Sequence, residues 1–235
     1  MRIAECWRLV ARWLGGRESA VLLSIVVVVS ATWALISIAG EVIEGNTLAI
    51  DQKIVRSIRG AEDVSVPVGP SWLTDAGRDV TALGSYSVVL LLVSLLTGFL
   101  LLVNRYQMTL FLVAASVGGI VFSRILKQTF NRPRPEIVPH FVDVSTSSFP
   151  SGHAMLSAAV YLSLATLLAT TTSRRRLKIY IVGVGILISL LVGVSRVYLG
   201  VHYPTDVLAG WCAGTTWALL CWLSYRWLSR RFSIE

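Results

Sequence analysis

The chain has 235 residues, of which 54% are hydrophobic and only 14% are charged, and its mean hydropathy is +0.69. An ordinary soluble domain carries about a quarter charged residues, so this composition excludes a single water-soluble core and favours an integral membrane protein. The net charge of +8 suits nucleic acid, an anionic lipid or an anionic substrate, depending on where the charges lie.

Six segments approach the length of about 20 mainly apolar residues that a bilayer span requires. In chain order they are residues 21–38, 87–103, 108–126, 154–172, 179–195 and 207–228. The first follows several arginines and resembles a signal peptide, but its apolar run is longer than the roughly 7 to 15 residues typical of one. We therefore expect an uncleaved span, and an all-α six-transmembrane-helix bundle forming a single domain over residues 1–235, with its motif-bearing core at about 87–228.

The basic residues predict the orientation of these spans. With the N-terminus inside, the inner side carries 12 basic and 3 acidic residues, so the positive-inside rule places both termini in the cytoplasm. Arg174–Arg176 is then a determinant of topology that faces inner-leaflet lipids. A role with nucleic acid is disfavoured, because the positive excess faces inward from short loops. The localisation expected is the cell (inner) membrane.

The longest connection, residues 41–84, then lies outside. Its apolar residues follow helical spacing in two stretches, which predicts two short amphipathic helices. The first stretch has Ile50, Ile54 and Ile58, and the second has Trp72, Leu73, Ala76 and Val80. Two alternatives remain for this segment: it lies on the outer membrane surface, or it packs as a lid over the bundle.

Three polar clusters exceed what a membrane bundle needs. They extend from Lys127 to Pro135, from Pro150 to His153 and from Ser195 to Asp206. The first closes the third span, the second opens the fourth, and the third joins the end of the fifth span to the start of the sixth. Because spans alternate in direction, all these ends lie on one membrane face, the outer one, where the clusters can converge.

The cations of this set suit a phosphate group. Lys127, Arg134 and Arg196 have no nearby acidic partner in the sequence, and arginine binds phosphate oxygens through two parallel hydrogen bonds. Gly152 lets the backbone approach an anion closely at the start of a helix, where the first amides form a ready phosphate site.

The two histidines supply the reactive groups. One can attack phosphorus while the other protonates the leaving oxygen. Pro204 suits the first turn of a helix, and from that turn Asp206 can reach back to the imidazole of His202 and fix its tautomer. Since one histidine must start neutral and the other protonated, we expect a bell-shaped dependence of activity on pH.

The motifs Lys-x6-Arg-Pro, Pro-Ser-Gly-His and Ser-Arg-x5-His-x3-Asp resemble the signature of the type-2 phosphatidic acid phosphatase superfamily, which includes bacterial lipid phosphatases, glucose-6-phosphatase and soluble vanadium haloperoxidases. All three match in the right order between Lys127 and Asp206. The resemblance implies that His202 is the nucleophile and forms a phosphohistidine, that Asp206 orients it, and that His153 is the general acid. It implies that the phosphate oxygens are held by Lys127, Arg134, Ser151, Gly152 and Arg196. It further implies that no metal or other cofactor is needed and that vanadate binds at the site.

The resemblance leaves the substrate open among undecaprenyl diphosphate, phosphatidic acid, phosphatidylglycerol phosphate and phosphorylated lipid A. A prenyl diphosphate or phosphatidate-type lipid is favoured, and a lipid A phosphatase or phosphotransferase is the alternative. A haloperoxidase is disfavoured because those relatives are soluble. A non-catalytic lipid-binding protein would be expected to lack His153 or His202, and both are present.

Several further residues match no motif position. Arg132 and Asn131 are equally open to assisting phosphate binding or not, and His140 with Asp143 is expected at a solvated rim. We expect the three cysteines, Cys6, Cys212 and Cys221, to be buried apolar residues without a disulfide or a zinc site. Three internal tryptophans, Trp33, Trp211 and Trp217, are expected to pack within the bundle.

Overall fold

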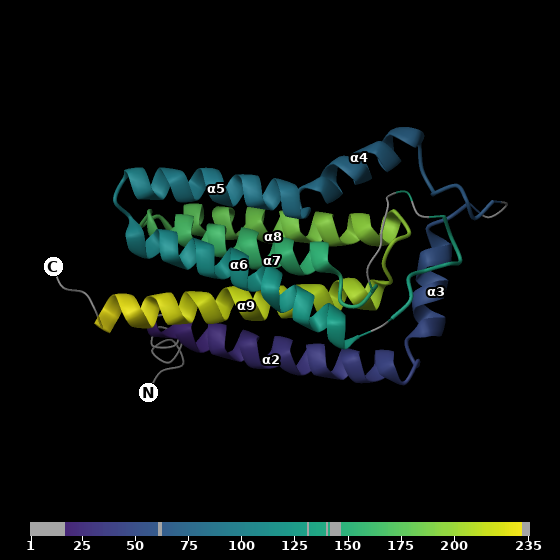
Figure 1. Cartoon of the computed structure of the whole chain (residues 1–235), viewed down its shortest axis with the longest axis horizontal. Helices are drawn as coiled ribbons and strands as arrows, with labels where there is room; N and C mark the ends of the chain where they lie inside the picture. The colour runs from purple at the N-terminus through teal and green to yellow at the C-terminus, as the bar shows by residue number, and fades with distance from the viewer. Residues whose placement is uncertain (1–16, 61–62, 131, 140, 142–146, 232–235) are drawn as a thin grey trace, which may run out of the picture.

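The computed structural model describes residues 17–60, 63–130, 132–139, 141 and 147–231, and its regular structure there is helical. The helices are α2 (Arg17–Ile43), α3 (Leu48–Ser57), α4 (Ser71–Ala82), α5 (Tyr86–Leu102), α6 (Tyr106–Thr129), α7 (Gly152–Thr170), α8 (Arg175–Tyr198) and α9 (Pro204–Arg231). Figure 1 shows the long helices running along one bundle axis, with α3 across one end. The predicted all-α fold is confirmed.

Five of the expected spans are single helices that are long and apolar enough to cross a membrane, namely α2, α6, α7, α8 and α9. The segment expected at 87–103 is α5, which has only 17 residues. It qualifies as a span only together with α4, from which it is bent by 47°. The bundle therefore has five or six spans, and the sixth is a broken helix.

The centre of the bundle is α7, which packs against α5, α6, α8 and α9. Its contact with α9 depends on the small residues Gly210 and Gly214, which are spaced as a GxxxG pair. A Cβ on Gly214 would lie 2.3 Å from the carbonyl oxygen of Met155, and one on Gly210 would lie 2.6 Å from that of Ser151. Glycines thus bring the two backbones close together, as is usual between helices in lipid.

Two of the three tryptophans expected to pack do so. Trp211 lies against Gly193 and donates its indole hydrogen to the carbonyl of Ser189 at 3.0 Å. Trp217 lies against Gly118 and donates to Ala115 at 2.9 Å in the same way. The expectation for Trp33 was wrong: it is 71% exposed on α2, a peripheral helix packed on α9 whose apolar surface faces outward, as it would toward lipid.

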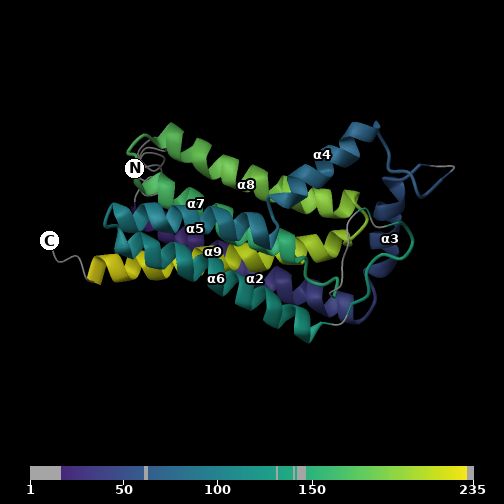
Figure 2. The same ribbon diagram turned by 45° about the horizontal axis from the view of Figure 1, so that its top comes forward.

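The end of the bundle that carries the motifs is covered by α3 and α4 (Figures 1 and 2). Helix α3 contacts α9, and α4 packs on α8. On α3, Val55 is buried with Val138 and Tyr203, whereas the predicted apolar positions Ile50 and Ile54 are 58% and 40% exposed. The packing alternative therefore holds for one face of α3, and the opposite face leaves apolar side chains free for a membrane surface.

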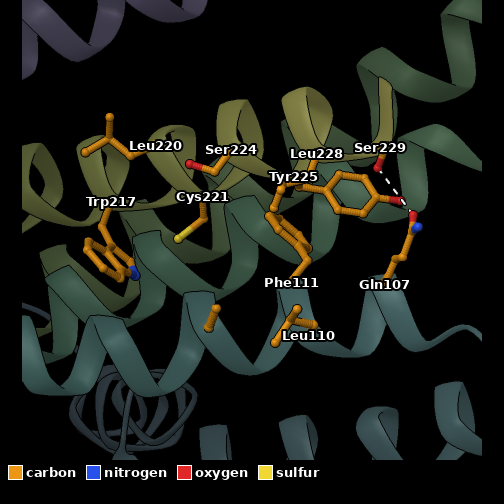
Figure 3. Close-up of a pocket in the computed structure, with 11 residues that line it drawn as sticks. Gln107, Leu110, Phe111, Trp217, Leu220, Cys221, Ser224, Tyr225, Leu228 and Ser229 are labelled. Carbon is orange, nitrogen blue, oxygen red and sulfur yellow. Dashed lines mark hydrogen bonds between the residues drawn. The ribbon is translucent and has the colours of Figure 1, made fainter. Parts of the chain in front are cut away.

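An apolar groove lies between α6 and α9 near the other end of the bundle, with a volume of about 640 Å³. Figure 3 shows Phe111 of α6 and Tyr225 of α9 in its wall, and the hydrogen bond from Ser229 to Gln107 at one end. None of its lining residues belongs to a motif, so the groove is separate from the site described next.

Candidate active site

Four helix ends and two loops bring the three motifs together. Lys127 lies in the last turn of α6 and Arg196 in the last turn of α8. Gly152 begins α7, and Asp206 lies in the first turn of α9. The backbone amide of Ser151 donates to the carbonyl of Asp206 at 2.9 Å, which ties the starts of α7 and α9 to each other.

Asp206 is fully buried and accepts hydrogen bonds on both carboxylate oxygens. Its Oδ1 accepts from Nη1 of Arg132 at 2.6 Å. Its Oδ2 accepts from the hydroxyl of Ser148 and from the amide of Tyr203, the latter at 2.8 Å. The same Oδ2 lies 3.5 Å from Nδ1 of His202. The carboxylate is therefore fixed in place before any substrate binds.

The surroundings of His202 determine its tautomer. Its Nε2 lies 3.2 Å from Nη1 of Arg134, and because a guanidinium only donates hydrogen bonds, Nε2 must carry the free lone pair. The proton is then on Nδ1, which faces Asp206. Burial lowers the pKa of His202 to about 3, although Asp206 acts to raise it. The imidazole is thus neutral at pH 7, with a lone pair on Nε2.

The three cations are held by neutral oxygens. Lys127 donates from Nζ to the carbonyl of Ser147 at 2.8 Å, and Arg134 donates to that of Val201 at 2.7 Å. Arg196 is buried and donates to the hydroxyl of Thr81 on α4 at 3.1 Å. Burial lowers the pKa of Arg134. Such a cluster favours an anion among its members.

Several buried polar atoms beside these cations have no hydrogen-bond partner in the part of the chain that the structure describes. They include the hydroxyls of Ser123 and Ser151 and Nε of Arg196. A Cβ on Gly152 would lie 3.1 Å from Cε of Lys127 and 3.4 Å from Oγ of Ser123. The glycine thus keeps a small polar space open at the start of α7, where helix amides favour an anion.

His153 is half-buried at the start of α7. The charges of Arg196, Lys127 and Arg134 and the imidazole of His202 all act on it. All eight site residues predicted from the sequence therefore lie around one polar region. The structure does not test their individual roles, which remain predictions.

Other polar residues of the site were not predicted. Ser123, Ser148 and Thr81 belong to no motif, and sequence spacing gives no signal for them. Arg132 forms ion pairs with two carboxylates, those of Asp51 on α3 and of Asp206. This position of Arg132 does not support a direct role in phosphate binding. Asn131, His140, Asp143 and Cys6 lie outside the described residues, whereas Cys212 and Cys221 are free and half-buried.

The model of the PAP2 superfamily matches residues 106–230, which is more than half of the chain. The chain is 34% identical over 153 residues to phosphatidylglycerophosphatase B of Bacillus subtilis (strain 168), covering 64% of this chain and 74% of that protein. It is 33% identical over 114 residues to an undecaprenyl-diphosphatase of Sulfolobus acidocaldarius, covering 48% of this chain and 47% of that relative, or about half its length.

The fold agrees with these matches. The crystal structure of a transmembrane PAP2-type phosphatidylglycerolphosphate phosphatase from Bacillus subtilis superposes with a TM-score of 0.75 at 26% identity, covering 88% of this chain and 98% of that one. The fold and the site thus define an integral membrane enzyme with five or six spans. The chain belongs to the PAP2 superfamily, and it is a membrane lipid phosphatase.

Proposed function

We propose that the chain removes the terminal phosphate of a phosphatidylglycerol phosphate-type lipid at the outer membrane face, through a phosphohistidine on His202 and without a metal ion. The phosphatidylglycerophosphatase relative supports this substrate, because the match covers most of its length. A prenyl diphosphate is the second candidate, supported by the undecaprenyl-diphosphatase relative. Both lipids present a terminal phosphate, which is the group that the cations suit.

In the first step, the Nε2 lone pair of His202 forms a bond to phosphorus. The bond between phosphorus and the lipid oxygen breaks, and its electron pair stays on that oxygen. His153 donates a proton to this oxygen, so that the lipid leaves as an alcohol, or as a monophosphate from a diphosphate. Oδ2 of Asp206 lies 3.5 Å from Nδ1, which retains its proton, and the carboxylate stabilises the positive charge that the ring acquires.

In the second step, the now neutral His153 takes a proton from water while the water oxygen attacks phosphorus. The bond from Nε2 to phosphorus breaks, its electron pair returns to the imidazole, and inorganic phosphate leaves. In both steps Lys127, Arg134 and Arg196 stabilise the charge on the transferring phosphoryl group. Such preorganised electrostatic stabilisation supplies most of the catalysis in phosphoryl transfer.

The observation that carries this proposal is the neutral, oriented imidazole of His202 beside the buried Arg196 and the half-buried Lys127 and Arg134. The test is phosphate release by purified protein in detergent with EDTA present, from phosphatidylglycerol phosphate, phosphatidic acid, undecaprenyl diphosphate and phosphorylated lipid A. We expect release without added metal, fastest from phosphatidylglycerol phosphate. His202→Ala is expected to lower kcat by about a thousandfold or more, as loss of a catalytic nucleophile does.

The outcomes separate the parts of the proposal. Residual activity of His202→Ala within tenfold of the wild type would show that another group attacks phosphorus. Loss of release in EDTA, restored by a divalent cation, would overturn the metal-free mechanism. A preference for the diphosphate would identify the second candidate as the substrate.

A further inference from the structure

A buried ion-pair network links the outer helix α3 to the carboxylate of Asp206. Arg132 lies between two acids: its Nη2 is 2.7 Å from Oδ2 of Asp51, and its Nη1 is 2.6 Å from Oδ1 of Asp206. Neither carboxylate has any exposed surface, and the Arg132 side chain is 10% exposed. Burying charged groups is costly unless they are paired, so this placement requires the full network.

The donors of Arg132 are directed to protein acceptors. Besides the two carboxylates, Nη1 donates to the hydroxyl of Thr205 at 2.8 Å and Nη2 to that of Thr47 at 3.2 Å. The four hydrogens on these two nitrogens thus meet four acceptors. The ring of Tyr203 lies 4.5 Å from the guanidinium carbon and holds its plane. This arginine therefore differs from Arg134 and Arg196, which lie among the phosphate-binding candidates.

Asp51 also holds the first turn of α9 directly. Its Oδ1 accepts from the amide of Thr205 at 3.1 Å, and its Oδ2 accepts from the Thr205 hydroxyl at 2.6 Å. Thr205 directly precedes Asp206, so α3 fixes this carboxylate in two ways, through its backbone and through Arg132. Val55, one turn further along α3, packs on Tyr203 beside His202.

We propose that Asp51 and Arg132 are positioning residues for the reaction at His202, which makes α3 part of the catalytic apparatus. This inference rests on the proposed function. By holding Oδ1 of Asp206, Arg132 leaves Oδ2 facing Nδ1 of the histidine. When Nε2 gains the phosphoryl group, the ring becomes cationic. Two carboxylates and one guanidinium carry a net negative charge that stabilises this ring.

The test is the variant Asp51→Asn, which keeps the shape of the side chain and removes its charge. We expect kcat for phosphate release to fall by roughly tenfold to a hundredfold, the scale of losing an outer partner of a functional histidine. KM and the inhibition constant of vanadate are expected to stay within threefold, because the phosphate-binding cations are untouched. A purely structural role would change these constants together or lower only the yield of folded protein.

The matched control is Asp75→Asn. Asp75 lies on the same outer segment and pairs with Arg78 at 3.2 Å, but its side chain is 71% exposed, so we expect kcat to stay within twofold. The inference is overturned if Asp51→Asn folds and keeps kcat within threefold of the wild type. Failure of the proposed function is recognised separately, because His202→Ala would then retain activity while Asp51→Asn is judged on its own ratio to the wild type.

A second variant covers the case in which Asp51→Asn does not fold. Thr205→Val removes the hydroxyl that lies between Asp51 and Arg132, at a half-buried position and without any change of charge. We expect a threefold to tenfold loss of kcat at unchanged vanadate inhibition. A kcat equal to that of the wild type in the folded Thr205→Val protein would overturn the inference as well.

Discussion

The charge on a single imidazole controls the chemistry at the residue scale. His202 interacts electrostatically with groups on four different segments of the chain: Asp206, Arg134, Arg196 and His153. Burial outweighs the carboxylate and lowers the pKa of His202 to about 3, well below the ordinary value of about 6.5. The nucleophile therefore needs no deprotonation at neutral pH. We therefore expect protonation of His202 to abolish activity only below pH 4, whereas a histidine with an ordinary pKa would lose activity near pH 6.5.

The same pKa predicts how stability depends on pH. The unfolded chain protonates His202 below about pH 6.5, whereas the folded chain resists protonation down to about pH 3. The unfolded state thus binds more protons in this window, and the stability of the fold falls as pH decreases through it. His202→Gln lacks this titration, so its melting temperature in detergent should fall less than that of the wild type between pH 6.5 and 4. An equal fall in melting temperature for the two proteins between pH 6.5 and 4 would contradict a buried neutral His202.

Sequence reasoning reached the motif residues because each motif lies at a span end. Alternating spans fix which ends share a face, and this brought Lys127, His153 and His202 together in the prediction. The pair of Asp51 and Arg132 could not be found in that way. The two residues are 81 positions apart, and Asp51 is one of several acids in a connection without a motif. The pairing of Asp51 with Arg132 can be recognised only from the packing of α3 on α9 in the structure.

At the scale of elements, the contact between α7 and α9 positions the site. The start of α7 carries His153, and the start of α9 carries Asp206. Glycines let these two helices approach so closely that a methyl group at position 214 would meet backbone atoms of α7. The site therefore depends on close helix packing more than on loops.

This dependence predicts the effect of Gly214→Ala. The added Cβ would lie 2.3 Å from the carbonyl oxygen of Met155 and 2.7 Å from Cβ of Ala158, so the helices must separate. We expect a destabilisation of about 1 to 3 kcal/mol, as for overpacked cores, together with a loss of kcat. Thermal unfolding in detergent and phosphate release measure the two effects.

The matched control is Gly183→Ala on α8, where an added Cβ meets nothing within 4 Å. Alanine favours a helix over glycine by roughly 0.5 to 1 kcal/mol, so this variant should be as stable as the wild type or more stable. Equal melting temperatures for Gly214→Ala and Gly183→Ala would show that the close approach of α7 and α9 contributes little.

Other features of the elements were open to prediction only in part. The hydrophobic pattern found the α3 and α4 helices but not the face by which α3 packs. A buried charged residue, Asp51, lies on that face, while the apolar Ile50 is exposed. The pattern placed α5 within one residue of its bounds, but it could not show that α5 is joined to α4 by a bend, because hydropathy carries no information on direction. The exposure of Trp33 has a related cause: a span that faces lipid is as apolar as one that is buried.

At the scale of the whole molecule, the orientation in the membrane connects the site to its substrate. The N-terminal end of α2 and the C-terminal end of α9 both lie at the end of the bundle opposite α3 (Figure 1). That side also carries the exposed arginines at the start of α8, Arg174–Arg176. Because basic residues remain in the cytoplasm, this end is expected inside, and α3 with the motif residues outside.

Labelling of single cysteines tests this orientation. In a background in which Cys6, Cys212 and Cys221 are replaced by alanine, Asp75→Cys on α4 and Arg175→Cys on α8 present exposed side chains at opposite ends of the bundle. A membrane-impermeant maleimide applied to intact cells, or to spheroplasts if an outer membrane is present, should label position 75 and spare position 175. Both should react after detergent is added. The reverse pattern would place the site in the cytoplasm, and the enzyme would then act on lipids of the inner leaflet. The proposed mechanism at His202 would stand in either case, because it depends on the geometry of the bundle end and not on the compartment that this end faces.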